Sequence, residues 1–259
     1  MINFTQISKK YGLSESLVKK EYYEVLIIKE LFNNKIAPAL ILKGGMALRL
    51  VYNSIRLSDD IDLSMKEDIT FNEFKTAINQ LCNKYDEIII KDIYEKFNTH
   101  FARLTIKSNK NIRDNLNIKI ELSKRPILIP YKGISDPMEL NSYKFTKISS
   151  ELFSEIYALG NVLTLETLYN DKLLCLKSRR KVRDVYDFWL LSNLLGKEYT
   201  PIYLKEEEET EFKNELKRHL LTKNYQLLDN LYIVDNNKAE EERNQSYEKN
   251  GYYSKDFEP

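Results

Sequence analysis

Apolar residues near the N-terminus recur at intervals that favour helices. Ile7, Tyr11, Val18, Tyr22, Leu26 and Leu31 lie three to seven residues apart, which predicts an amphipathic helical segment over residues 1–35. Gly12 interrupts the pattern, and Ser14 is placed to cap the helix that follows. Residues 5–20 also resemble a helix-turn-helix, but two short helices packed on a larger domain produce the same pattern and are the interpretation we favour.

A mixed α/β domain is predicted over residues 36–140. The apolar run 39–42 reads as a strand, and residues 46–52 have helical period and composition. Residues 68–85 are expected to form a second helix. Further strands are expected at residues 61–63, 88–90, 101–106 and 116–122. This order of elements favours a sheet that is partly antiparallel.

The second half of the chain reads differently. Four prolines and glycines crowd residues 126–137, which predicts a loop and a domain boundary. From about residue 151 to Leu195 the pattern predicts helices, so residues 141–235 are expected to form a helical lobe. Residues 236–259 are polar and are expected to be a loosely held tail.

Composition excludes several kinds of site. The 40 basic and 39 acidic residues give a net charge of +1, so nucleic-acid binding would need a local patch. Two cysteines, Cys82 and Cys175, and two histidines, His100 and His219, exclude a cysteine zinc site and a histidine-rich metal site. A metal would therefore be a hard cation held by carboxylates. No signal-like or membrane-spanning apolar segment occurs, which predicts a cytoplasmic protein.

Two glycines and two aspartates provide the first chemical motifs. Gly44 and Gly45 lie between a predicted strand and helix, where a phosphate can approach the backbone, although a tight structural turn has the same pattern. No Walker A sequence is present. Asp60 and Asp62 alternate with apolar residues on a strand, so both carboxylates project from one face. Their mutual repulsion would be relieved by a divalent cation.

Two further segments extend this hypothesis. Glu121 lies on an alternating strand and would complete a three-carboxylate site if that strand lay beside Asp60 and Asp62. Six basic and no acidic residues occur between positions 172 and 183, followed by Asp184 and Asp187. A cationic face beside carboxylates suits a polyphosphate substrate. Salt bridges Arg180–Asp184 and Arg183–Asp187 are the structural alternative.

These segments together resemble the AbiEii-type nucleotidyltransferases. The similar blocks are KGGMALRL, RLSDDIDLS, IKIELS and NDKLLCLKSRRKVRDVYDFWLL, with EYYEVLIIKELF resembling the family's leading helix, so the resemblance covers roughly residues 20–192. These proteins are toxins of abortive-infection and type IV toxin–antitoxin systems. The resemblance implies a polymerase-β-like nucleotidyltransferase lobe with a mixed sheet and a C-terminal helical lobe, two lobes facing each other across a nucleotide cleft.

The resemblance also implies roles for individual residues. Asp60, Asp62 and Glu121 would hold Mg²⁺, with Mn²⁺ as the alternative. Lys43, Gly44, Gly45, Ser58, Lys172 and Arg183 would bind the NTP, and Lys172, Asp184 and Asp187 would belong to the catalytic set together with the three metal ligands. The family usually has Thr or Ser after the glycines, where this chain has Met46. Phosphate contact at that position would then come from backbone amides and Ser58.

The expected reaction is Mg²⁺-dependent transfer of a nucleoside monophosphate from an NTP to an acceptor hydroxyl. The resemblance implies a toxin, with tRNA as the acceptor and a separately encoded antitoxin as a partner. A protein hydroxyl is an alternative acceptor. A non-enzymatic DNA-binding regulator reading through residues 5–20 is a further alternative, as is a nucleotide-binding relative without activity, against which the three carboxylates argue.

Overall fold

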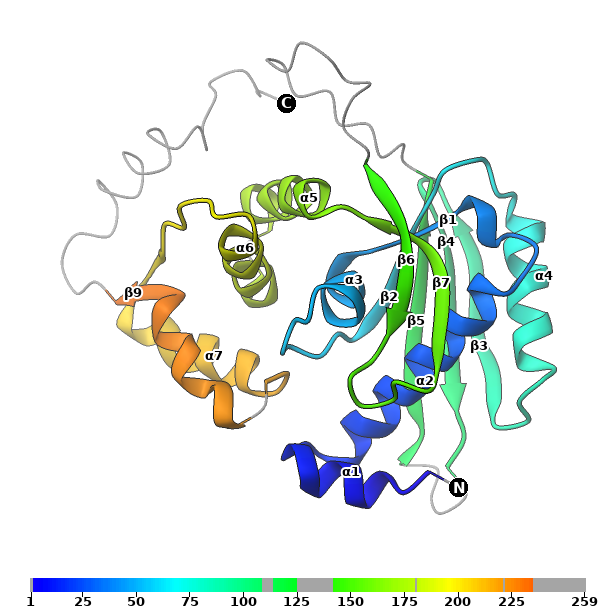
Figure 1. Cartoon of the computed structure of the whole chain (residues 1–259), viewed down its shortest axis with the longest axis horizontal. Helices are drawn as coiled ribbons and strands as arrows, with labels where there is room; N and C mark the ends of the chain where they lie inside the picture. Colours follow the sequence, from blue (N-terminus) through cyan, green and yellow to red (C-terminus); the bar gives the residue numbers. More distant parts are fainter. Residues whose placement is uncertain (1, 109–113, 125–141, 180, 221, 235–259) are drawn as a thin grey trace, which may run out of the picture. The chain divides into compact units, whose positions relative to one another are not determined.

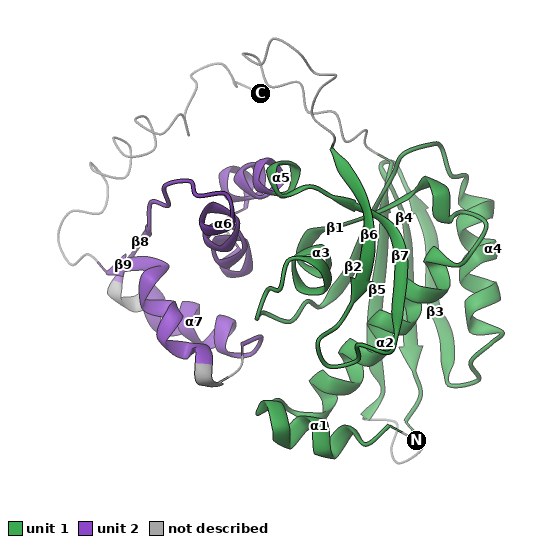
Figure 2. Cartoon of the chain, in the orientation of Figure 1, with its two compact units in different colours: residues 1–168 green, residues 169–259 purple. Residues whose placement is uncertain are grey.

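The chain forms two compact units in a computed structural model that describes residues 2–108, 114–124, 142–179, 181–220 and 222–234. Unit 1 is Met1–Leu168 and unit 2 is Tyr169–Pro259 (Figure 2). The sequence placed this division at residues 140–141, and the structure places it after Leu168. The predicted loop 126–137 and polar tail 236–259 lie outside the described residues.

The N-terminal segment forms two helices, as the sequence predicts. Helix α1 spans Phe4–Tyr11 and helix α2 spans Glu15–Phe32. Gly12 ends α1 with a φ of 65°, a left-handed conformation that glycine adopts without strain. The Ser14 side chain accepts a hydrogen bond from the Leu17 amide and caps α2. The predicted break and the predicted cap are therefore both confirmed.

Unit 1 is built on a seven-stranded mixed sheet with the strand order β3-β4-β5-β2-β1-β7-β6. The strands are β1 Leu40–Lys43, β2 Asp60–Met65, β3 Ile88–Lys96, β4 Thr99–Ile106, β5 Leu116–Ser123, β6 Tyr143–Ser149 and β7 Tyr157–Leu163. Strands β2 to β5 contain the strands expected from the sequence, and β1 overlaps the expected strand 39–42 but begins one residue later. Strand β2 pairs antiparallel with β1 and parallel with β5, so the expected mixture of directions is confirmed.

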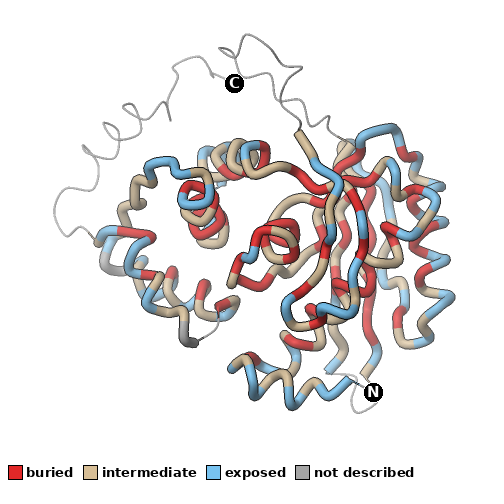
Figure 3. The backbone as a smooth tube through the Cα atoms, in the orientation of Figure 1, coloured by how far each residue is buried: buried red, intermediate tan, exposed pale blue. Residues whose placement is uncertain are grey.

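Helices cover the sheet on both sides. Helix α3 spans Gly44–Val51 and packs on β1 and β2, and α4 spans Phe71–Cys82 and packs on β3 and β4. Helix α2 packs on β5 and β7. Figure 1 shows α3 on one side of the sheet, with α2 and α4 on the other. Buried residues gather in the central strands and in the helix faces against them (Figure 3).

The prediction of continuous helix from residue 151 is wrong in its first part. Residues 143–163 form strands β6 and β7, which extend the sheet beyond β1. The apolar positions of β7 gave no local signal for a strand, and its pairing with β1 is a long-range contact that local periodicity does not report. Helical structure begins with α5, Leu165–Ser178, and continues with α6, Val182–Leu194.

Unit 2 is mainly helical, as expected for the C-terminal part of the chain. After α6 it contains β8 Ile202–Leu204, α7 Glu206–Lys217, the 3₁₀ segment Thr222–Asn230 and β9 Tyr232–Val234. Strands β8 and β9 form a small parallel pair that the sequence analysis missed. Across the described ranges, no helix combines the length and apolar character required to cross a bilayer.

Candidate active site

The acidic residues predicted in unit 1 lie on the adjacent strands β2 and β5. The parallel register places Asp62 opposite Glu121. Ile61 and Leu63 are fully buried, because alternate residues of β2 face the hydrophobic core. Asp62 and Glu121 therefore project together from the other face of the sheet. The predicted proximity of these two acidic residues is thus supported by the strand register.

Asp60 precedes Asp62 by two residues on β2, so its side chain lies on the same face of the sheet. The register pairs it with Lys119, and the Lys119 ammonium lies 3.5 Å from the Asp60 carboxylate. Both side chains are substantially exposed, so this ion pair is weakly held and can be exchanged for another ligand. The sequence analysis did not single out Lys119, although its alternation with Glu121 on β5 was visible.

The donor set suits a hard cation, but its side chains are not gathered around one point. In the part of the chain that the structure describes, no group of three or more His, Cys, Asp or Glu side chains has an arrangement that could hold a metal ion. Asp60, Asp62 and Glu121 offer carboxylate oxygens from one face of adjacent strands. Those are the ligand types that Mg²⁺ prefers, so the residue types fit the ion.

The two glycines lie against the aspartate strand. Gly44 has a φ of 67°, and a Cβ atom there would overlap the Asp62 carboxylate and lie 3.1 Å from its Cγ atom. A Cβ on Gly45 would lie 2.6 Å from a guanidinium nitrogen of Arg56 and 2.9 Å from the Ser58 hydroxyl oxygen. The absence of side chains therefore lets the Gly44-Gly45 turn approach Asp62 and Ser58 closely.

The same turn begins helix α3. Lys43 is the N-cap residue, so the first backbone N–H groups of α3 lie beside the Asp62 face and lack intrahelical acceptors. Such a helix terminus favours an anion, phosphate in particular. Met46, which stands where the family usually has a hydroxyl residue, is fully buried in the core. Its side chain therefore packs inward, away from the surface of the turn.

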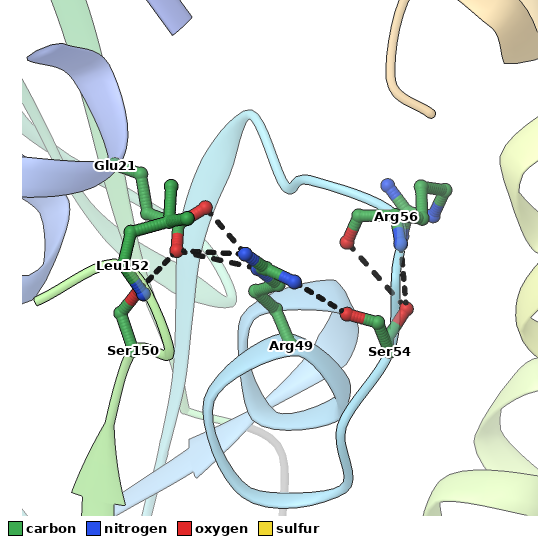
Figure 4. A network of polar contacts seen from close by, with 6 residues as sticks. All are labelled: Glu21, Arg49, Ser54, Arg56, Ser150 and Leu152. Atoms are coloured by element: carbon green, nitrogen blue, oxygen red, sulfur yellow. Dashed lines mark hydrogen bonds and ion pairs between the residues drawn. The ribbon is translucent and has the colours of Figure 1, made fainter. Parts of the chain in front are cut away.

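A buried polar network supports the loop between α3 and β2 (Figure 4). The Arg49 guanidinium donates to both carboxylate oxygens of Glu21, at 3.1 Å each, and to the Ser54 carbonyl at 2.8 Å. Ser150 donates its hydroxyl to the same carboxylate, and the Arg56 amide donates to the Ser54 hydroxyl at 3.2 Å. Helices α2 and α3 and the end of β6 thereby fix the loop that carries Ser58.

A second carboxyl group of α2 is buried near the start of β2. Glu24 is 1% exposed, and burial raises its pKa well above the ordinary value. Lys20 opposes this shift, whereas Glu21, Asp59 and Asp60 add to it. Lys20 also forms a 2.9 Å ion pair with Asp59. Glu24 consequently ionises less readily than an exposed glutamate and adds less negative charge near Asp60.

Unit 2 holds the other predicted residues in a buried ionic cluster. The Lys172 ammonium lies 2.8 Å from Asp184 and 2.8 Å from Asp187, joining α5 to α6. Arg179 adds a 2.9 Å contact to Asp184. Burial acts to raise the pKa of Asp184, but the charges and hydrogen bonds of Lys172 and Arg179 outweigh it and hold that pKa below its ordinary value.

This cluster adds a partner from α5 to the i,i+4 ion pairs expected on α6. Asp184 is paired with Lys172 and Arg179, and Asp187 with Lys172, so the long-range partner on α5 was missed by a local i,i+4 reading. Arg180 lies outside the described residues. Arg183 belongs to the first turn of α6. Apart from the motif, no pattern in the sequence indicated that Lys172 lies close to Asp184 and Asp187. Their proximity depends on how α5 packs against α6, which local patterns do not report.

The arrangement of unit 1 defines a class of protein. A mixed sheet carries paired acidic residues on one face, beside a Gly-Gly helix start, and this is the architecture of a nucleotidyltransferase. MenT4, the nucleotidyltransferase toxin Rv2826c from Mycobacterium tuberculosis H37Rv, has a similar fold, with a TM-score of 0.52 at 14% identity over 91% of this chain and 82% of that one. JHP933 from Helicobacter pylori matches with a TM-score of 0.45 at 21% identity, covering 86% of each chain.

The family is shown by the sequence itself. Residues 27–250 match the family described as nucleotidyl transferase AbiEii toxin, type IV toxin–antitoxin system. The chain therefore belongs to this family, and the resemblance noted from its motifs is confirmed. It is a nucleotidyltransferase of the toxin type, which implies a nucleotide substrate and an antitoxin partner. No curated protein shows significant similarity to the chain.

Proposed function

We propose that this toxin transfers a nucleoside monophosphate from an NTP to a hydroxyl group of an RNA acceptor, in a Mg²⁺-dependent reaction with tRNA as the expected RNA. The observation that carries the proposal is the parallel register of Asp62 with Glu121 beside the start of α3. Carboxylates and the first backbone amides of α3 lie there on one side of the sheet, so a metal and a triphosphate would have complementary partners at one place.

The metal would be held by Asp60, Asp62 and Glu121, with Mn²⁺ as the alternative ion. When bound, Mg²⁺ neutralises phosphate charge and polarises the reacting oxygens. Asp60 would exchange its exposed ion pair with Lys119 for the metal. Lys119 is then released to face the phosphates or the acceptor.

The phosphates would be bound by the start of α3 and by cations. The backbone amides after Lys43, at Gly44 and Gly45, and the Ser58 hydroxyl are the contacts offered by unit 1. Lys172 and Arg183 are the phosphate contacts that the family resemblance implies. Asp184 and Asp187 hold the Lys172 ammonium in place, which explains why a phosphate-binding lysine would be accompanied by two buried aspartates.

In the transfer step, the acceptor hydroxyl oxygen attacks the α-phosphorus of the NTP. A new oxygen–phosphorus bond forms, the bond to the bridging oxygen breaks, and pyrophosphate leaves with the bonding electron pair. The hydroxyl proton passes to Glu121 or to water. The cations around the triphosphate stabilise the charge that builds on the leaving group.

The DNA-binding alternative receives no support from the N-terminal helices. Two of the four lysines available to a reading helix are engaged within the protein: Lys19 pairs with Glu15 at 2.7 Å and Lys20 with Asp59 at 2.9 Å. Helix α2 is also packed on β5 and β7. A toxin that modifies RNA would act in the cytoplasm, where NTPs and tRNA are present.

The experiment is transfer of label from each of four [α-³²P]NTPs to total RNA in the presence of Mg²⁺. Wild-type protein should label RNA, the label should be removed by nuclease, and EDTA should abolish it. Asp62→Asn should be inactive. Label that resists nuclease but is lost with protease would establish a protein acceptor instead, and no labelled macromolecule with any NTP would contradict the proposal.

A further inference from the structure

A row of side chains leads outward from the candidate metal site. The strand registers pair Asp62 with Glu121, Glu121 with Phe101, and Phe101 with Tyr94. Directly opposed residues project from the same face of a sheet, so all four share one face. With neighbouring strands about 4.8 Å apart, Tyr94 lies roughly 14 Å from Asp62, on the edge strand β3. The catalytic face therefore continues without interruption to the sheet edge.

Aromatic rings occupy the outer part of this row. Tyr94 and Phe101 stack with their ring centroids 4.7 Å apart. Phe101 is buried beneath its neighbours, whereas Tyr94 is 40% exposed. Phe97, in the turn between β3 and β4, is 93% exposed. Tyr94 and Phe97 leave aromatic surface open to solvent, so their position beside the catalytic face suggests a ligand that stacks on them.

Cations accompany the rings. The Lys96 ammonium lies 4.8 Å from the centroid of Phe101 and 5.4 Å from that of Tyr94. The Arg103 guanidinium lies 5.7 Å from the Phe101 centroid and pairs with Asp92 at 3.3 Å. Both members of that pair are about a third or more exposed, so the pair is weak and a phosphate can replace its anion.

The opposite face of β3 and β4 packs against helix α4. His100, which follows the other alternation of β4, stacks on Phe74 of α4 and donates from Nε2 to the Ile69 carbonyl at 2.8 Å. Helix α4 thus covers that side. Tyr94, Lys96 and Arg103 consequently lie on the same face as Glu121, not at the α4 contact.

We propose that this surface, formed by Tyr94, Lys96, Phe97, Arg103 and Lys119, binds the single-stranded end of the RNA acceptor. The inference rests on the proposed function and adds where and in what form the RNA is bound. Alternating rings and cations match unstacked bases joined by phosphates, since every base offers a face for stacking. In a duplex the bases stay stacked on one another, so only its phosphates could contact this surface and the exposed rings would gain no stacking partner.

The test compares the double variant Tyr94→Ala/Phe97→Ala with wild type in the RNA-labelling assay. The KM for RNA should rise about tenfold or more, because two stacking contacts are lost, while the KM for the NTP stays the same. Lys96→Glu should weaken RNA binding and reduce its dependence on salt. Phe145→Ala, which removes a phenyl ring that is 68% exposed on β6, is the matched control and should leave both KM values unchanged.

Direct binding completes the test. Asp62→Asn protein should bind a fluorescent single-stranded RNA more tightly than a duplex of the same sequence, and the aromatic double variant should remove that preference. An unchanged KM for RNA in the double variant, with wild type labelling RNA, overturns this inference and leaves the proposed function standing. A wild-type protein that labels no RNA overturns both. Thermal melting checks that each variant is folded.

Discussion

Asp62 and Glu121 stand directly opposite each other on two parallel strands, although a helix, a hairpin and several turns separate them along the chain. Their side chains share one face, because the alternate residues Ile61 and Ile120 are fully buried on the other. Strand pairing thus brings the second acidic residue beside the first, and on this relationship both are proposed as metal ligands.

The first prediction concerns these two acids. Asp62→Asn should lower transfer at least about a hundredfold, and Glu121→Gln by roughly 10²–10⁴-fold, because each removes a charge acting on the transition state. Single-turnover transfer at saturating NTP and Mg²⁺ measures the loss. Asp68→Asn, the same change at an exposed residue before α4, is the control and should retain full activity. Near-normal transfer by Glu121→Gln would remove Glu121 from the site.

The second prediction compares two glycines with the same backbone conformation. Gly44 and Gly12 have φ values of 67° and 65°, so alanine is strained at both, at a cost of about 1–2 kcal/mol. Only at Gly44 does the new Cβ also overlap the Asp62 carboxylate, since nothing lies within 4 Å of the corresponding atom at Gly12. Gly44→Ala should therefore lose transfer activity, whereas Gly12→Ala should lose stability alone.

Chemical denaturation and RNA labelling, measured on both glycine variants, separate the two effects. Equal losses of activity would show that the backbone conformation, and not the approach to Asp62, explains the requirement for Gly44.

The third prediction concerns the buried pair Glu21–Arg49. Arg49→Met leaves a carboxylate buried with only the Ser150 hydroxyl from this network, and it should cost about 3–5 kcal/mol of unfolding free energy. The double variant Glu21→Met/Arg49→Met should recover part of that loss, because no buried charge remains unpaired. A double-mutant cycle by urea denaturation measures the coupling. Additive losses would mean that the pair is not coupled.

The fourth prediction is a dependence of stability on pH in unit 2. Lys172 and Arg179 hold the pKa of Asp184 below its ordinary value of 3.8. A depressed folded pKa means that the stabilisation is present above pH 3.8 and is lost as the pH falls through the folded pKa. Asp184→Asn should therefore be less stable than wild type at neutral pH, and the difference should shrink below about pH 4.

Trp189 gives a local signal for this measurement. It is the only tryptophan of the chain and lies on α6, two residues after Asp187. Its fluorescence during urea unfolding at several pH values reports on unit 2. Asp229→Asn, at a carboxylate that is 72% exposed, is the control. A difference that is constant from pH 7 to pH 3 would contradict the ionic explanation.

Much of the fold followed from local patterns. The break at Gly12, the cap at Ser14 and the strands up to β5 could be predicted because each depends on alternation, helical period or capping chemistry within a few residues. Strands β6 and β7 could not, since they join the sheet only when β7 pairs with β1 and β6 pairs with β7. The short pair β8–β9 was missed for the same reason.

The sequence by itself determined the family and the chemical types at the site: two glycines before a helix, alternating aspartates, a glutamate on a later strand and a basic helical segment. Only the tertiary structure decided which of them are neighbours. The register of β2 with β5 places Asp62 opposite Glu121. The ion pairs between α5 and α6 place the Lys172 ammonium between Asp184 and Asp187. Local sequence fixes which face a side chain occupies, whereas long-range pairing selects the partner that it meets there.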